Sequence, residues 1–161
     1  MGVVTRILLG LVCLLSWIGV AFSQPYQVKA FDVVYYLYKG EKLEWYFKAK
    51  EFIEVSPNYF MAKLVHIVND PKHIIIKGKE ATYDRLKDEF IIVGNATFIA
   101  PKVGTILTQE LIFYPSKSLV TTDKEVEVRK KGMLIKGKGM TYYINTGEFR
   151  LKQRANIKFE L

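Results

Sequence analysis

Residues that could carry out catalysis or bind a metal are few and scattered in this sequence. The two histidines, His66 and His73, are six intervening residues apart, and nothing places them on one face of an element. The one cysteine, Cys13, lies inside an apolar N-terminal run, so a metal site would depend on carboxylates alone. No serine and histidine form a recognisable nucleophile motif. The sequence therefore predicts no catalytic residue, no metal ligand and no cofactor.

Two further features of the sequence, an aspartate in a turn and a pair of glycines, have structural explanations. Asp84 opens the turn DRLKD (84–88), where we expect its carboxylate to cap backbone N–H groups. Gly137 and Gly139 are not followed by the helix that a phosphate-binding loop requires. Within a strand, such glycines predict a bulge or a bend.

The N-terminal segment predicts export. An apolar run, 7–22, follows one positive charge, Arg6, and its sixteen residues would span roughly 24 Å as a helix, against roughly 30 Å of hydrocarbon. Ala21 and Ser23 also occupy the −3 and −1 positions of a signal-peptidase site before Gln24. Both interpretations, a retained anchor or a cleaved signal, divide the chain into 1–24 and 25–161. Both place the second part outside the cytoplasm, with Arg6 on the cytoplasmic side.

Length and charge narrow the possibilities for residues 25–161. The chain of 161 residues is long enough for one domain. Its net charge of +8 arises from basic residues interspersed with sixteen acidic ones, which suits a mixed surface, a membrane surface or a phosphorylated lipid. Export and the lack of paired aromatic and basic stacking motifs argue against nucleic acid.

An internal repeat indicates how these residues are organised. A shift of 59 residues places 76–98 on 135–157 with nine identities, and a looser copy lies at 110–128. Each unit consists of a strand, a tyrosine, a short polar turn and a second strand, and the turns are 84–88, 115–118 and 144–147. Earlier turns are expected at 56–58 and 69–73. Alternating apolar and polar residues between these turns predict an all-β antiparallel meander, whose interior is either filled by side chains or left partly open as a trough.

The order of the motifs resembles a known family. GKEATYDRLKDEFIIVGNATF (78–98) is similar to the signature of OstA-like domains in lipopolysaccharide transport proteins. GEKLEWYFKAKEFIE (40–54) and the segment 106–151 resemble the opening and closing patterns of the LptC family. The resemblance covers most of residues 32–161.

This resemblance implies a twisted antiparallel β jelly roll after one N-terminal hydrophobic helix. It implies a non-enzymatic component of lipopolysaccharide transport, anchored in the inner membrane by a single segment, with its domain in the periplasm. In that family an apolar groove receives the acyl chains of lipid A from an inner-membrane ABC transporter. The next periplasmic jelly roll, an LptA-like protein, then receives the lipid and is joined through edge-strand pairing.

The strand at the end of the chain fits that arrangement. Residues 149–161 alternate between apolar and basic side chains and end without a turn. Such a free edge invites aggregation in an isolated protein, whereas in a bridge of jelly rolls it can pair with a partner strand. We therefore expect the C-terminal strand to be the docking edge, although a covering strand would also explain it.

Because side chains alternate between the two faces of a strand, the apolar residues of one face would line the groove or fill the core. They are Trp45, Phe47, Phe90, Ile92, Phe98, Phe149, Leu151, Ile157 and Phe159. Four lysines that recur in the two repeats could meet lipid phosphates at a rim or could simply be solvated: Lys77, Lys79, Lys136 and Lys138. Three alternatives remain open at this point: a soluble periplasmic bridge protein of the LptA type with a cleaved signal, a structural β adaptor that binds no lipid, and a secreted hydrolase, which the missing catalytic site disfavours.

Overall fold

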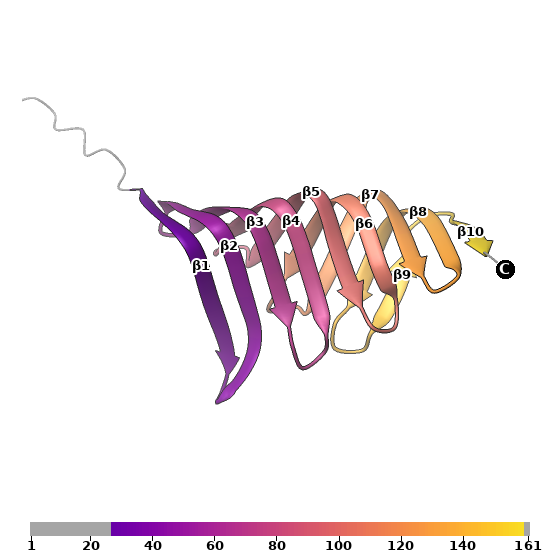
Figure 1. Ribbon diagram of the computed structural model, residues 1–161, viewed down its shortest axis with the longest axis horizontal. Coiled ribbons are helices and arrows are strands. Elements are labelled where there is room, and N and C mark those ends of the chain that lie inside the picture. Colours follow the sequence, from indigo (N-terminus) through magenta and orange to yellow (C-terminus); the bar gives the residue numbers. More distant parts are fainter. Residues whose placement is uncertain (1–26, 160–161) are drawn as a thin grey trace, which may run out of the picture.

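The computed structural model describes residues 27–159 and shows one long antiparallel meander (Figure 1). Its strands are β1 (Val28–Lys39), β2 (Lys42–Ser56), β3 (Tyr59–Asn69), β4 (Ile74–Asp84), β5 (Glu89–Ala100), β6 (Gly104–Tyr114), β7 (Leu119–Lys130), β8 (Met133–Tyr143), β9 (Glu148–Leu151) and β10 (Asn156–Phe159). Each strand from β1 to β8 pairs with the next along the chain, and β8 pairs with both β9 and β10. The all-β antiparallel class is confirmed, and the expected helix within 1–24 lies outside the described residues. Within residues 27–159, no helix is long and apolar enough to cross a membrane.

The predicted turns are found where the polar residues placed them. Turns occupy 57–58, 70–73, 85–88, 115–118 and 144–147. The Oδ1 atom of Asp84 accepts hydrogen bonds from the backbone N–H groups of Leu86 and Lys87, at 3.0 and 3.2 Å. The capping role predicted for Asp84 is therefore confirmed.

The strands from β4 to β8 have irregularities in their register near their middles. Shifts occur between Lys77 and Glu80, between Val93 and Ala96, between Thr108 and Ile112, and between Thr122 and Glu125. Gly139 lies opposite the last of these shifts with a φ of +74°, so the predicted bend at the glycines of β8 is found there. A bulge bends a strand and increases its twist, and a row of bulges across neighbouring strands folds the whole sheet along one line.

The sheet folds into two leaves that pack on each other. Trp45 in β2 contacts Phe113 in β6 with ring centroids 4.8 Å apart, and Phe98 in β5 contacts Tyr142 in β8 at the same distance. These strands are not hydrogen-bonded neighbours, so the contacts cross between leaves. We name as the first leaf the strand halves that end at turns 40–41, 70–73, 101–103 and 131–132. The second leaf contains the halves that end at 57–58, 85–88, 115–118 and 144–147.

The two leaves are offset along the meander. A first-leaf half faces a second-leaf half that comes three or four strands later, as the pairs β2 with β6 and β5 with β8 show. The second-leaf halves of the first strands are therefore not covered by the first leaf. The first-leaf halves of the last strands are likewise not covered by the second leaf. The fold consequently has two open ends, which we call the N-terminal mouth and the C-terminal mouth, on either side of a closed middle.

Candidate functional site

A row of aromatic rings forms the floor of the N-terminal mouth. Phe52, Phe60, Tyr83 and Phe90 come from the second-leaf halves of β2, β3, β4 and β5, and their side chains are half-buried. Successive ring centroids along this row are 5.3, 6.2 and 4.2 Å apart, with nearly parallel planes. The row continues from Phe90 to the buried Phe113 at 5.9 Å. Aromatic faces that are stacked on each other and open on one side provide an apolar surface for a flexible chain.

Side chains of the first leaf stand opposite this floor. Phe47 lies 6.1 Å from Phe90, measured between ring centroids. Tyr35 on β1 pairs with Phe47 across the ladder and is 62% exposed. The N-terminal mouth is therefore lined on both leaves by aromatic residues.

The one polar group on the floor is held by its neighbours. The hydroxyl of Tyr83 donates a hydrogen bond to Oδ1 of Asp88 at 3.0 Å. Burial, followed by this hydrogen bond, raises the pKa of Tyr83 to about 12. The other oxygen of Asp88 accepts the backbone N–H of Ser116 at 2.7 Å, so the same carboxylate ties two turns of the second leaf together. Tyr83 thus presents a neutral ring to the mouth at any physiological pH.

The middle of the fold is filled by side chains. Ile92, Phe98, Ile106 and Leu111 each have no exposed surface, and Phe113 is 2% exposed. Close packing of this kind leaves no room for an extra chain unless the leaves move. The sequence left open whether the interior is filled by side chains or is an empty trough. In residues 27–159 the middle is filled.

A lysine joins the rims of the two leaves over this filled middle. Lys72 lies in the β3–β4 turn of the first leaf, and its Nζ donates to the backbone oxygen of Ile144 and to Oδ1 of Asn145, both at 3.2 Å. Ile144 and Asn145 belong to the β8–β9 turn of the second leaf. The backbone N–H of Lys72 donates to Oδ1 of the buried Asn69 at 3.0 Å, which fixes the position of the turn. We call this set of bonds the rim clasp.

The C-terminal mouth is apolar and much more exposed. Ile157 and Phe159 on β10 are 54% and 70% exposed, and they lie opposite Ile135 and Met133 of β8. The single strand expected over 149–161 is divided in two: β9 pairs with the second-leaf half of β8 and β10 with its first-leaf half. The break follows the bend of β8 at Gly139, because the edge strand must turn the same corner.

The predicted groove residues are distributed over three regions rather than one. Phe47 and Phe90 lie beside the N-terminal mouth, and Trp45, Ile92 and Phe98 are buried in the core. Phe149 and Leu151 on β9 are partly buried against the core. Ile157 and Phe159 lie at the C-terminal mouth. The four recurring lysines, Lys77, Lys79, Lys136 and Lys138, are all exposed.

The alternation of apolar and polar residues in the sequence did not identify four inward-facing residues, which are Phe52, Phe60, Tyr83 and Phe113. In β2 the alternation Trp45, Phe47, Ala49 follows odd numbers, but Lys50 is unpaired in both ladders and the inward face then falls on Phe52. The register itself does not shift there, and the residues opposite Lys50, Asp32 and Leu64, have positive φ. The signal in the sequence was the interruption of the alternation at Lys50 and Glu51.

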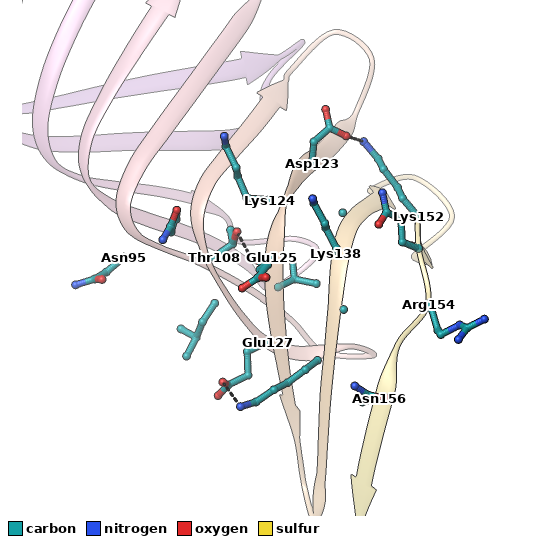
Figure 2. A pocket seen from close by; sticks show the side chains of 17 residues that line it. Asn95, Thr108, Asp123, Lys124, Glu125, Glu127, Lys138, Lys152, Arg154 and Asn156 are labelled. Carbon is teal, nitrogen blue, oxygen red and sulfur yellow. Dashed lines mark hydrogen bonds and ion pairs between the residues drawn. The ribbon is translucent and has the colours of Figure 1, made fainter.

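A hollow of about 1330 Å³ is lined mainly by polar and charged side chains (Figure 2). These side chains come from β6, β7, β8 and the segment between β9 and β10, with Asn95 of β5. Lys152 donates to Asp123 at 2.8 Å and Lys136 lies 3.9 Å from Glu127. Opposite charges therefore meet across this open surface. Within residues 27–159, no three potential metal ligands gather at one place.

Residues 25–160 match the family described as lipopolysaccharide-assembly, LptC-related. No curated protein sequence matches the chain. Among solved structures, the fold is similar to that of LptH from Pseudomonas aeruginosa, described as the LptA-homologous periplasmic component of the lipopolysaccharide transport device. The TM-score is 0.52 at 9% identity, over 84% of this chain and 96% of that one, which establishes a shared fold.

Proposed function

The chain belongs to the LptC-related family of lipopolysaccharide-assembly proteins, and we propose that its N-terminal mouth receives the acyl chains of lipopolysaccharide from an inner-membrane ABC transporter. Membership makes the protein a transport component with a periplasmic domain, not an enzyme. The observation that carries the proposal is the half-buried row Phe52, Phe60, Tyr83 and Phe90. These rings form a stacked apolar row that the fold leaves partly uncovered.

The energetics of the mouth suit a lipid in transit. Each CH₂ group that leaves water contributes about 0.8 kcal/mol, so a few groups lying on the rings bind with useful strength. A chain that also entered the middle would have to separate leaves that are already packed. The mouth therefore favours capture, and the closed middle limits how deeply the lipid is held.

Passage beyond the mouth would require the leaves to part. The rim clasp of Lys72 opposes this movement with two hydrogen bonds, each contributing about 1 kcal/mol. Such bonds are weak enough to break when acyl chains arrive. We propose that the lipid spreads the leaves at this seam and then leaves through the C-terminal mouth.

The free strand edge at the C-terminal mouth would bind the next jelly roll, to which the lipid is transferred. One edge of β10 has no partner strand among the described residues, so its N–H and C=O groups can pair with an LptA-like jelly roll. Ile157 and Phe159 would then continue the apolar path into the partner. The lipid-binding residues proposed from the sequence at this end keep that role in the proposal.

The segment 1–24 would act as a single-pass anchor in the inner membrane. Mass determination of the native protein tests this directly: an intact N-terminus supports the anchor, and a start at Gln24 would instead indicate a soluble bridge protein of the LptA type. A structural adaptor without lipid is the remaining alternative.

Photo-crosslinking at two adjacent positions separates transport from the adaptor role. A photoreactive residue at Phe60 faces the mouth, whereas one at Tyr59 faces the outer side of the same strand and is 37% exposed. In full-length protein with lipopolysaccharide, position 60 should crosslink to lipid and position 59 should not. Crosslinks to protein alone at position 60, or equal lipid labelling at both positions, would contradict the proposal.

A further inference from the structure

An apolar patch lies on the outer side of the sheet near the start of β1. Phe31 is 66% exposed, Leu64 61% and Met61 42%. Phe31 and Leu64 border a shallow hollow of about 500 Å³. A smaller hollow of about 130 Å³ beside Met61 shares Glu51, Lys63 and Glu80 with the first. Exposed apolar residues that are grouped in this way are typical of contact surfaces.

Leu64 has an unusual backbone conformation. Residues with positive φ along the bend of the sheet are Asp32, Leu64, Gly94, Asn95 and Gly139. Glycine, asparagine and aspartate tolerate this region, whereas a leucine there is uncommon and costs free energy. Leu64 recovers little of this cost by burial, since most of its side chain is exposed. A strained and exposed apolar residue is therefore better explained by a contact outside the domain than by folding.

Lysines surround the patch. Lys29 lies 3.0 Å from Glu51 and stands over the ring of Phe31 at 5.2 Å from its centroid. Lys50 bonds to Asp32 at 2.6 Å, and Lys63 lies 3.5 Å from Glu51. With Lys79 and Glu80 the border holds four lysines and three acids. Long basic side chains around protruding apolar ones suit the boundary between lipid headgroups and acyl chains.

The position of the patch in the chain brings it close to a membrane. Val28 follows the last residue of the apolar run, Phe22, by six residues, and six residues span at most about 20 Å. Phe31 is on the same strand, and Leu64 is two strands away, because Phe31 pairs with Glu51 and Glu51 with Lys63. A protein anchored through that run would hold the patch near the bilayer surface.

We propose that Phe31, Met61 and Leu64 insert into the headgroup region of the inner membrane and fix the orientation of the domain on it. The proposal rests on the anchor in the proposed function. It adds a second contact with lipid, on the outer side of the sheet and separate from the mouth that binds acyl chains. The domain would then stand in one orientation, with its C-terminal mouth held away from the bilayer.

A fluorescent label at position 64 tests the contact. The full-length chain carrying Cys13→Ser and Leu64→Cys is labelled with an environment-sensitive dye. It is then reconstituted in vesicles of phosphatidylethanolamine and phosphatidylglycerol. The matched control is Leu86→Cys, because Leu86 is an even more exposed leucine, at 80%, in the β4–β5 turn. We expect emission at position 64 to shift to shorter wavelength and to lose most of its intensity to doxyl-labelled lipid, with no change at position 86.

Three outcomes would overturn the proposal. They are no shift at position 64, a shift without quenching by lipid, which would mean that protein covers the patch, and equal quenching at both positions. Lipopolysaccharide crosslinking at position 60 in the same vesicles reports on the proposed function independently.

Unfolding temperatures test the strain on Leu64. Leu64→Asn should raise the melting temperature by about 2 to 4 °C, because asparagine tolerates the positive φ. In protein labelled at Met61→Cys, the same substitution should weaken quenching by lipid. Leu86→Asn should change neither property. A lower melting temperature for Leu64→Asn would show that Leu64 serves the fold and would overturn the proposal.

Discussion

The N-terminal mouth and the middle of the fold are built from the same kinds of residue but differ in what covers them. In the middle, inward side chains from both leaves meet, and Ile92, Phe98 and Leu111 have no exposed surface. At the mouth, the offset between the leaves removes the cover from one side, and Phe52, Phe60 and Tyr83 remain half-buried. Apolar composition alone therefore does not make a binding surface in a folded sheet. The offset of the leaves decides which apolar residues are free to bind.

Replacing one phenylalanine in each region should separate the two roles most strongly. Phe113→Ala leaves a cavity in the closed middle and should lower the free energy of unfolding by about 3 to 5 kcal/mol. Phe60→Ala removes a half-covered ring and should cost about 1 to 2 kcal/mol, while reducing lipopolysaccharide capture several-fold. Urea unfolding and lipid co-purification measure the two effects. Equal losses of stability would show that the mouth is as closed as the middle.

A new carboxylate should lower the stability of the fold more in the packed region around β9 than at the exposed C-terminal mouth. Leu151 is packed against the core, close to Gly137 and Ala155, and Leu151→Asp should lower the free energy of unfolding by about 2 to 4 kcal/mol. Phe159→Asp at the exposed C-terminal mouth should change it by less than about 0.5 kcal/mol and should weaken transfer to the partner. Circular dichroism must accompany the lipid assays. A stable, lipid-binding Leu151→Asp protein would contradict the packing described for β9.

The rim clasp should oppose access to the middle. Lys72→Met removes its bonds to Ile144 and Asn145 and should lower the free energy of unfolding by about 2 kcal/mol. It should also speed the uptake of lipopolysaccharide, because the leaves part more easily. Lys131→Met, in the exposed β7–β8 turn of the same rim, is the control and should do neither. Slower uptake by Lys72→Met would mean that the clasp helps binding instead.

The smallest predicted effect is the dependence of the free energy of unfolding on pH. The folded protein holds the proton of Tyr83 up to a pKa of about 12, against 10.0 for the free side chain. Between these values the folded state binds more protons than the unfolded state, so stability falls as pH rises above about 10. Tyr83→Phe should remove this part of the loss, by no more than about 1 kcal/mol at pH 11. Urea unfolding at pH 9 and pH 11 measures it, and parallel losses in both proteins would contradict the shift.

Much of the fold could be predicted from the sequence because it rests on local signals. The turns at 85–88, 115–118 and 144–147 follow from Asp, Pro, Ser, Asn and Gly, and period-2 alternation gives the strands between them. The floor of the mouth could not be predicted in the same way. Phe52 reaches it because the pairing of β2 is interrupted at Lys50, and Phe60 because that of β3 is interrupted at Leu64. Both interruptions depend on how the strands pair. The offset that exposes these rings is likewise a property of the assembled leaves.

The distance between the two rims is the most direct test of whether acyl chains pass between the leaves. Spin labels at Asp70→Cys and Thr146→Cys, in a Cys13→Ser background, flank the rim clasp on exposed positions of opposite leaves. We predict that the distance between them increases by several ångströms when lipopolysaccharide binds, since a filled interior can admit acyl chains only if the leaves separate. An unchanged distance in protein whose position 60 is crosslinked to lipid would contradict passage through the middle.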